Sequence, residues 1–347
     1  MPELRKDPII GRWVIVAKER ARRPGNLVDS DAYSLPEEDC PFCEHREPKT
    51  PPEIYALRTG GGHANAAGWQ VRVVPSIKPM LGIEGQLSRR GHGLYDAMNG
   101  VGAHEVVVET PQHIANMAEL DIRQIERVLE TYIFRINDLE KDQRFKCVLV
   151  FKNYGWSAGG GRIRHARSQL IATPVNPWRI KEELNGAKRY FEYHERCIYC
   201  DLIRQETEAK KRIVMESENF IAITPFASRF PFEVWILPKR HHCDFSKGAL
   251  GLQLDLAKAL KCVLLKLKLG LGDPAYNFVI HSAPFRRKSA KGTDWKTIDE
   301  DYHWHIEVMP RITHVAGFEK GTGFYICPIP PEDTADFLKR ETVEIEA

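Results

Sequence analysis

Apolar stretches recur along the chain in two series that follow the same order. The first series predicts strands, from alternating or continuous apolar positions, at residues 10–17, 71–75, 105–109, 145–151 and 165–173. Asp121 is a predicted helix N-cap, and the apolar residues after it stand three or four positions apart as far as about Lys141. The first half is therefore expected to hold strands with one amphipathic helix packed against them.

The second series predicts strands at residues 220–225, 233–237, 277–281 and 303–309, and an amphipathic helix that ends at Gly270. A charged segment, residues 181–195, predicts a helical connector. Each half is a strand–strand–helix–strand–strand unit, which places the chain in the α+β class with antiparallel sheets and packed helices. The repeat predicts two tandem domains, at residues 1–178 and 190–340.

Cysteine and histidine residues repeat together with these strands. Each half offers a Cys-x2-Cys pair followed by two histidines at strand ends, and two thiolates with two imidazoles form a zinc tetrad. The first predicted site is Cys40, Cys43, His113 and His165, and the second is Cys197, Cys200, His241 and His303. Four protein ligands close each site, so we expect two structural zinc ions per chain.

His242 competes with His241 for a place in the second site. The offset from Glu233 to His241 is eight residues, and the offset from Glu105 to His113 is also eight. The repeat therefore favours His241 as the ligand.

Glycine-rich segments predict loops at residues 59–65, 82–103 and 153–161. The third loop follows a predicted strand and is expected to bring backbone N–H groups close to a ligand. This loop precedes the strand that carries His165.

Composition excludes several classes of function. A net charge of +3 on 347 residues gives no case for nucleic acid as the main partner. No apolar run approaches the ~18 residues needed to cross a bilayer, and the N-terminus lacks the apolar core of a signal peptide. Four of the eight cysteines form the Cys-x2-Cys pairs and the others stand singly, which is typical of a reducing compartment. We therefore expect a cytoplasmic protein without membrane or nucleic-acid partners.

The segment that begins at Asn153 carries a family resemblance. The pattern Asn153-x-Gly155-x-x-Ala158-Gly159-Gly160, followed by His165-x-x-Ser168-Gln169-Leu170-Ile171-Ala172, resembles the active-site strand of galactose-1-phosphate uridylyltransferases. These enzymes are duplicated members of the histidine-triad superfamily. Arg5-x-Asp7-Pro8 and His303-Trp304-His305-Ile306-Glu307 resemble the same family. The resemblance runs from about residue 3 to residue 340 and implies two tandem histidine-triad-like domains.

The resemblance implies a double displacement through a histidine. In this family an imidazole attacks the α-phosphorus of a nucleotide-sugar, and a sugar 1-phosphate then takes the nucleotide. The residue two positions before the nucleophile binds zinc, and here it is His165. The nucleophile position is Arg167, whose guanidinium stays protonated and has no free lone pair. Arg167 can bind a phosphate but cannot carry the nucleotide.

The resemblance also implies a substrate pocket. Gln169, which supports the phosphate in the family, is retained, whereas Ser76 and Arg162 replace the family's asparagine and serine, and Cys327 replaces a late asparagine. The implied substrate-binding residues are Arg20, Arg23, Ser76, Asn153, Gly159, Gly160, Arg162, Gln169, Lys320 and Gly321. The implied partners are a nucleotide-sugar, a sugar 1-phosphate and a second copy of the chain in a homodimer.

The sequence leaves two functions open. One is a nucleotidyltransferase of galactose and nucleotide-sugar metabolism that exchanges a nucleotide between a nucleotide-sugar and a hexose 1-phosphate, by a replacement nucleophile or by direct in-line transfer. The other is a non-catalytic binder of nucleotide-sugars or sugar phosphates, since loss of a covalent nucleophile commonly lowers a rate by about 10⁴ to 10⁶. The retained glycine loop and Gln169 argue against a zinc-stabilised interaction protein without a small ligand.

Overall fold

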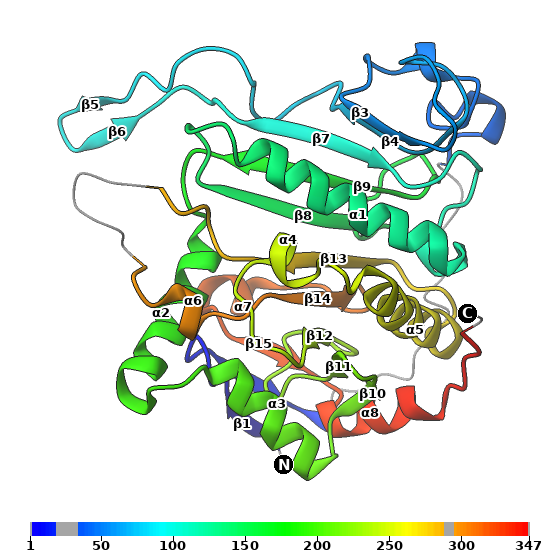
Figure 1. The fold of residues 1–347 in the computed structure, drawn as a ribbon. Helices are drawn as coiled ribbons and strands as arrows, with labels where there is room; N and C mark the ends of the chain where they lie inside the picture. Colours follow the sequence, from blue (N-terminus) through cyan, green and yellow to red (C-terminus); the bar gives the residue numbers. More distant parts are fainter. Residues whose placement is uncertain (1, 19–33, 288–294, 346–347) are drawn as a thin grey trace.

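The computed structural model describes residues 2–18, 34–287 and 295–345, and a single ten-stranded antiparallel sheet runs through both halves (Figure 1). The spatial order of its strands is β10 (Ile213–Glu216), β11 (Phe220–Ile223), β12 (Val234–Pro238), β14 (His305–Pro310), β13 (Tyr276–His281), β8 (Cys147–Tyr154), β9 (Arg167–Thr173), β7 (Ala103–Val108), β4 (Trp69–Pro75) and β3 (Tyr55–Arg58). The first five strands come from the second half and the last five from the first half. The order of the first half mirrors that of the second, as expected for a duplicated unit.

The two halves meet at the pair of strands β8 and β13. Their antiparallel register places Phe151 opposite Val279 and Asn153 opposite Asn277. The α+β class with antiparallel strands is confirmed, but the strands of the two halves form one sheet by main-chain hydrogen bonds across this seam. The sequence alone did not predict this joining.

One face of the sheet is covered by the helices α1 (Ile122–Leu139) and α5 (Gln253–Leu271), which lie side by side across both halves (Figure 1). Helix α1 begins where predicted, because the Asp121 side chain accepts a hydrogen bond from the Gln124 amide at 2.8 Å. Helix α5 continues one residue past the predicted end and stops at Gly272, whose φ of 70° suits a left-handed C-cap. Apolar side chains of both helices and both half-sheets form one buried core.

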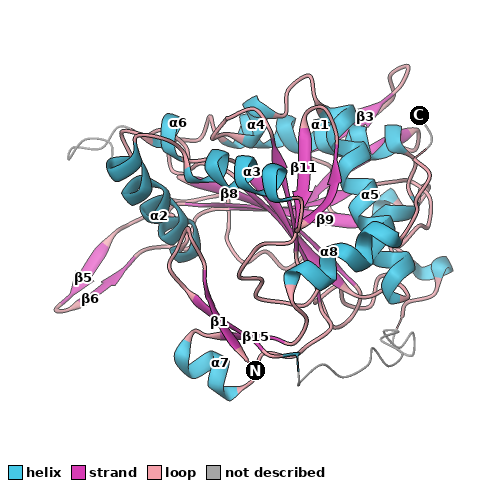
Figure 2. Cartoon of the chain, turned by 90° about the horizontal axis from the view of Figure 1, so that it is seen from below, coloured by secondary structure: helices cyan, strands magenta, loops and turns pink. Residues whose placement is uncertain are grey.

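The opposite face of the sheet differs between the two halves. In the second half it is covered by α2 (Trp178–His194) and α3 (Ile198–Ala209), which bury a second apolar cluster (Figure 2). The predicted connector is therefore confirmed as α2, while α3 was not predicted. In the first half the same face carries the first Cys/His group and the glycine loop.

A small sheet ties the N-terminal segment to the second half. Strand β1 (Glu3–Lys6) pairs with β2 (Trp13–Val16), and β15 (Tyr325–Cys327) pairs with β2 in parallel. The predicted strand at residues 10–17 begins only at Trp13, because the Asp7 carboxylate accepts hydrogen bonds from the Ile9 and Ile10 amides and closes a turn.

Several short elements complete the described part of the chain. They are η3 (Glu37–Asp39), η4 (Glu47–Lys49), η5 (Met117–Glu119), the hairpin of β5 (Arg90–His92) and β6 (Tyr95–Ala97), α4 (Phe245–Gly248), α6 (Ile298–Asp301), α7 (Gly317–Thr322) and α8 (Pro331–Arg340). The β5–β6 hairpin lies in the segment that was predicted as a loop, residues 82–103. Among the helices of the described ranges, none is both long and apolar enough to cross a membrane.

Candidate metal centres and nucleotide site

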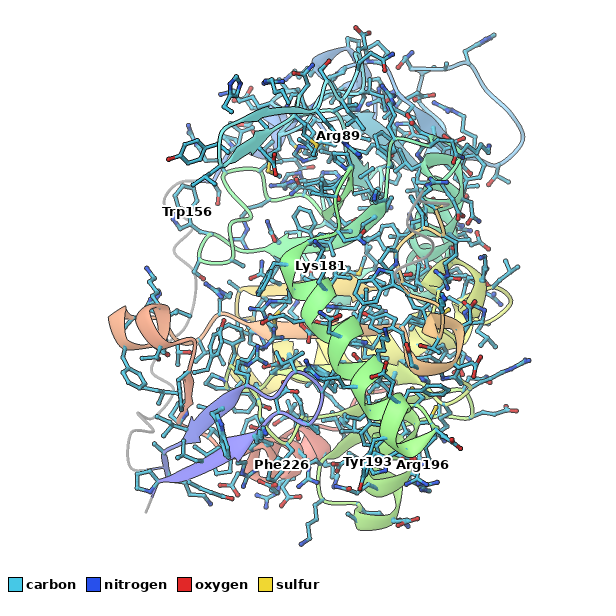
Figure 3. The ribbon with its side chains drawn as sticks, turned by 90° about the vertical axis from the view of Figure 1, so that its left-hand side faces the viewer. Arg89, Trp156, Lys181, Tyr193, Arg196 and Phe226 are labelled. Atoms are coloured by element: carbon cyan, nitrogen blue, oxygen red, sulfur yellow. The ribbon has the colours of Figure 1, made fainter. Side chains whose placement is uncertain are left out.

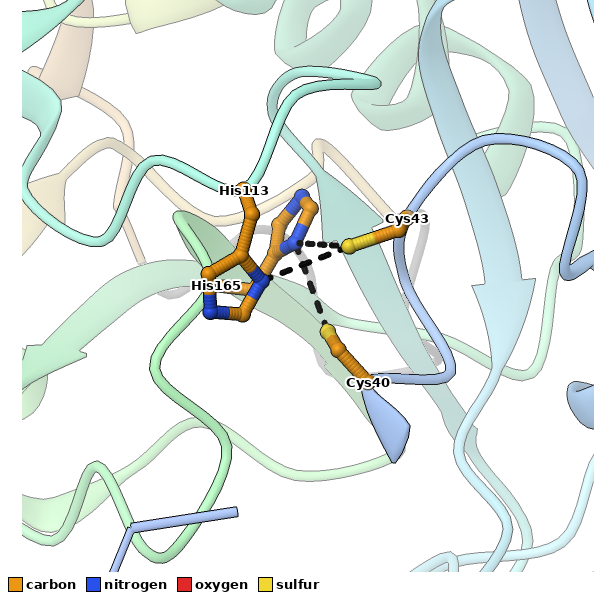
Figure 4. Close-up of side chains that lie close together, drawn as sticks. All are labelled: Cys40, Cys43, His113 and His165. Atoms are coloured by element: carbon orange, nitrogen blue, oxygen red, sulfur yellow. Dashed lines mark hydrogen bonds between the residues drawn. The ribbon is translucent and has the colours of Figure 1, made fainter. Parts of the chain in front are cut away.

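The first Cys/His group forms where four residues from three separate segments converge (Figure 4). The Sγ of Cys43 lies 3.3 Å from the Nδ1 of His113, and the Sγ of Cys40 lies 3.5 Å from the Nδ1 of His165. The other ring nitrogen of His165 lies 2.8 Å from the carbonyl oxygen of Thr110, so this bond turns Nδ1 toward the thiols. Burial lowers the pKa of His165 to about 4. The imidazole is therefore neutral near pH 7, as a metal ligand must be.

The second group repeats this geometry. The Sγ of Cys200 lies 3.4 Å from the Nδ1 of His241 and 3.7 Å from the Nδ1 of His303. The Nε2 atom of His303 lies 2.9 Å from the carbonyl oxygen of Pro238, and that of His241 lies 3.0 Å from the carbonyl oxygen of Asp299. In each group the potential ligand atoms of all four predicted residues lie within 4.8 Å of one another. This sulfur and nitrogen donor set fits a tetrahedral zinc ion.

The histidine that the repeat offset favoured, His241, is the one that lies in this cluster. His241 lies in the group, whereas the Nδ1 of the neighbouring His242 accepts a hydrogen bond from the Asp244 amide at 3.0 Å. His242 instead joins Cys243 and Asp244 in a separate close set of side chains.

Strand β9 presents alternate residues to the two faces of the sheet. Arg167 and Gln169 are half-buried and point away from α1, while Ser168 is buried and its hydroxyl lies 2.5 Å from that of Tyr132 on α1. Because side chains alternate between the two faces of a strand, the pattern from His165 to Thr173 places the family's reactive positions, Arg167 and Gln169, on the face away from α1, which we call the open face. The first predicted site and the reactive positions share this face.

A buried ion pair lies directly behind the start of β9. Lys152 is 1% exposed and Glu109 is fully buried, and the lysine Nζ donates to the Glu109 carboxylate at 2.6 Å and to the Arg167 carbonyl at 3.0 Å. Burial lowers the pKa of Lys152, and the carboxylate of Glu109 opposes this shift. The pair therefore holds the backbone of residue 167 in place by a charge-assisted hydrogen bond.

The Arg167 side chain is bound by the glycine loop. Its guanidinium donates to the carbonyl oxygens of Ile163 at 2.5 Å and His165 at 3.1 Å, and also to that of Gly160. It lies 5.7 Å from the centre of the Phe42 ring. All three hydrogen-bond acceptors are backbone carbonyls, so this side chain fastens the loop to β9. The structure therefore gives Arg167 a role in shaping the loop that its sequence position did not predict.

The two glycines of this loop shape the turn. A Cβ atom on Gly160 would lie 2.6 Å from the carbonyl oxygen of Gly155, and Gly159 has a φ of 82°, which disfavours other residues. Their amides donate within the loop, Gly159 to Trp156 and Gly160 to Gly155. These two backbone N–H groups are therefore engaged within the loop itself. The glycines serve the loop's compactness.

Two residues that the sequence analysis missed orient the polar side chains of this site. The Nδ1 of His104 accepts a hydrogen bond from the Met80 amide, so its Nε2–H donates to the Oε1 of Gln169 at 2.7 Å. Asn277, from the second half, donates to the Oδ1 of Asn153 at 2.8 Å and to the carbonyl of Ala158.

Each of these contacts occupies a side-chain oxygen. Within the described residues, no protein acceptor engages the amide nitrogen of Gln169, so that group is available to a ligand. No sequence signal marked His104 or Asn277, because each acts on a partner far along the chain.

The remaining predicted binding residues are not all in one place. The amide of Ser76, after β4, donates to the carbonyl of His104, so Ser76 is close to the Gln169 pair. Arg162 is exposed on the glycine loop. Lys320 and Gly321 are exposed on α7, which Figure 2 shows beside β1 and β15 and apart from β9. Arg20 and Arg23 lie outside the described residues.

The counterpart of this site in the second half is closed. His305, the repeat counterpart of Arg167, is 1% exposed, and burial lowers its pKa to about 4. His281 lies between the carboxylates of Glu183 at 2.9 Å and Glu307 at 3.2 Å. Burial lowers the pKa of His281, but the two carboxylates outweigh it and raise the pKa to about 10. Potential ligand atoms of Glu183, His281 and His305 also lie within 4.8 Å of one another. The His305 ring is therefore shielded from solvent by the surrounding side chains.

Comparisons with known proteins agree with this arrangement. Residues 82–177 match the N-terminal domain, and residues 183–329 the C-terminal domain, of galactose-1-phosphate uridyl transferase. An ADP-glucose phosphorylase from Arabidopsis thaliana is 34% identical over 97% of this chain and 92% of its own length. A galactose-1-phosphate uridylyltransferase from Thermotoga maritima is 29% identical over 99% of this chain and 100% of its own length.

Solved structures extend the likeness to three dimensions. The crystal structure of an ADP-glucose phosphorylase from Arabidopsis thaliana with bound ADP-glucose aligns with a TM-score of 0.82 at 34% identity, covering 99% of this chain and 100% of that one. A uridylyltransferase structure aligns with a TM-score of 0.73 at 29% identity, covering 98% and 97%. The duplicated sheet, the paired Cys/His groups and these matches along nearly the whole chain lead to one conclusion: the chain belongs to the galactose-1-phosphate uridylyltransferase family of nucleotidyltransferases.

Proposed function

We propose that this chain transfers a nucleotidyl group from a nucleotide-sugar to a phosphate acceptor in a single in-line displacement, without a covalent enzyme intermediate. The observation that carries the proposal is Arg167, which occupies the nucleophile position and offers only donors. Family membership supports the transfer reaction, and the ADP-glucose bound to a relative with 34% identity supports an ADP-hexose as the first donor to test.

In this reaction an acceptor oxygen attacks the α-phosphorus of the nucleotide. The bond from that phosphorus to the oxygen of the sugar phosphate breaks, and the sugar 1-phosphate leaves with the bonding electrons. A hexose 1-phosphate acceptor gives a new nucleotide-sugar, and inorganic phosphate gives a nucleoside diphosphate. Both acceptors attack through a phosphate oxygen. The protein catalyses this step by positioning the two substrates and by stabilising the negative charge on the phosphates.

The residues of the open face have different proposed roles in binding the phosphates. We assign the amide nitrogen of Gln169 to the α-phosphate, because His104 already occupies the Gln169 oxygen. Asn153 bounds the same face with its oxygen held by Asn277. Arg167 contributes positive charge beside the phosphates while it fastens the glycine loop. Arg162, on the same loop, is the second cation of the proposed phosphate site.

Two zinc ions, one in each Cys/His group, are proposed as structural parts of the site. Zinc on Cys40, Cys43, His113 and His165 would fix the chain immediately before Arg167. We also propose a cytoplasmic homodimer, following the family resemblance. Because α7 lies apart from β9 within the chain, Lys320 and Gly321 would act on the site of a second copy.

Kinetics with two substrates test the proposal. Purified protein is incubated with ADP-glucose and either inorganic phosphate or a hexose 1-phosphate, and initial rates are measured over a grid of both concentrations. A single displacement gives intersecting double-reciprocal lines, and a chiral α-phosphorothioate donor gives inversion at phosphorus. Parallel lines, retention or a nucleotidyl adduct on the wild-type chain would overturn the mechanism. Tight binding without any turnover would make the chain a nucleotide-sugar binder.

A further inference from the structure

A second concave site lies at the other end of the strands that carry the candidate nucleotide site. The pocket has a volume of about 580 Å³, and we call it the basic pocket. Its lining includes Arg89, Asp96, Lys146, Val175, Lys181 and Trp295. They come from the β5–β6 hairpin, the approach to β8, the exit of β9, the first turn of α2 and the segment before α6.

The basic pocket is separate from the nucleotide site. Arg167 begins β9 and Thr173 ends it, and six steps of about 3.3 Å place these two residues about 20 Å apart, with Val175 beyond Thr173. Lys146 likewise precedes β8, whereas Asn153 lies near its far end. A ligand in the basic pocket therefore contacts residues that flank the ends of these two strands, away from the reactive positions.

Three cations of the basic pocket have no partner among the described residues. Within the described residues, no hydrogen bond or ion pair engages the side chains of Arg89, Lys146 or Lys181. Among its described lining residues, Asp96 alone is acidic. Figure 3 views the molecule from this side and shows Arg89 above Lys181 on the face toward the reader. An excess of cations over one acidic residue in a concave site favours an anionic ligand.

The N-terminus of α2 adds further positive potential to the basic pocket. The helix has 17 residues, and its N-cap is Pro177, which makes no side-chain hydrogen bond to the first turn. Asn176, just before that turn, and Lys181, within it, both line the basic pocket. The positive end of the helix dipole lies beside these residues and adds to the positive potential of the basic pocket.

We propose that the basic pocket binds a small phosphorylated molecule carrying at least two negative charges, at a site distinct from the nucleotide site. The volume lies within the range of small-molecule sites, roughly 300–1,000 Å³. Val175 and the ring of Trp295 offer an apolar wall beside the cations. This proposal does not rest on the transfer reaction, because binding alone defines it.

Titration of the full chain with pyrophosphate tests the proposal by calorimetry. The double variant Lys146→Ala/Lys181→Ala should raise the dissociation constant of one class of sites at least tenfold. A matched control, Lys188→Ala/Lys247→Ala, removes the same charge from surface lysines that pair with acids of their own segments, and should change it less than twofold. Gln169→Ala should leave this class unchanged.

Four results would overturn the proposal. The first is an unchanged dissociation constant in Lys146→Ala/Lys181→Ala, and the second is an equal increase in the control variant. The third is a loss of pyrophosphate binding confined to Gln169→Ala. The fourth is absence of pyrophosphate binding together with a lower oligomer mass for Lys146→Ala/Lys181→Ala. The last result would show that the cations contact a second copy of the chain. All the substituted lysines lie at the surface, and a thermal melt of each variant verifies folding before titration.

Discussion

Substitution of Arg167 by histidine tests how much of the transfer machinery this chain retains. The arginine donates hydrogen bonds to the carbonyls of Gly160, Ile163 and His165. Histidine is shorter and cannot span the same acceptors. Three such bonds contribute about 2–4 kcal/mol to the free energy of unfolding. Burial of the charged guanidinium, which lowers the pKa of Arg167, opposes part of this contribution, and the substitution removes that cost. We therefore expect the free energy of unfolding to fall by about 1–3 kcal/mol.

The substitution should also create a nucleophile. An imidazole at residue 167 would stand two positions after His165, on the open face of β9. Its neutral form has a lone pair, so it can attack the α-phosphorus and release a sugar 1-phosphate. Incubation of Arg167→His with ADP-glucose and no acceptor should therefore give an acid-labile mass increase of one nucleoside monophosphate. The wild-type chain should show none.

Arg167→Gln is the matched control for this experiment. It also breaks the attachment of the glycine loop, but its amide nitrogen has no available lone pair for attack. It should lose about the same stability as Arg167→His and form no adduct. If Arg167→His folds and binds ADP-glucose yet gains no adduct, the inferred position of residue 167 opposite the α-phosphorus is wrong. If the wild type turns over rapidly and both variants are silent, the guanidinium itself stabilises the transition state.

Three further predictions follow from the described contacts. Cys40→Ser should lower the zinc content measured by atomic emission from two to one per chain and reduce the melting temperature. The control Cys262→Ser, whose residue lies outside both groups, should keep two zinc ions. A wild-type chain that is metal-free and insensitive to chelators would contradict this prediction. Gln169→Ala should weaken nucleotide-sugar binding by about 1–3 kcal/mol in calorimetry, and unchanged affinity would place the phosphate elsewhere. His281 has a folded pKa raised to about 10, so its stabilising effect is complete below about pH 6.5 and is lost as the pH rises toward 10. The stability difference between wild type and His281→Gln in urea unfolding should therefore shrink over that pH interval, and a constant difference would refute the assignment.

The sequence predicted those features that depend on local spacing. The helix after Asp121 and the strand pattern around Gln169 follow from side-chain periodicity. The two Cys/His groups could be predicted because the chain carries the same spacing twice, so each copy tests the other. Only this repeated spacing distinguished His241 from His242 as the predicted ligand.

The features that escaped prediction depend on contacts between distant segments. The register of Phe151 with Val279, which joins the half-sheets, is set by main-chain groups that carry no side-chain signal. Asn277 supports Asn153 only because of that register. The fastening of the glycine loop by Arg167 depends on the path of the loop, and helix α3 begins directly after Cys197 inside a segment that was assigned to metal ligation.

The seam between β8 and β13 has a consequence for the integrity of either half alone. Each of these strands is interior to the ten-stranded sheet, and separation of the halves would turn both into long open edges. Unpaired edge strands pair readily with other chains. A fragment ending near residue 178 should therefore self-associate through β8, and two such fragments would rebuild a sheet of ten strands.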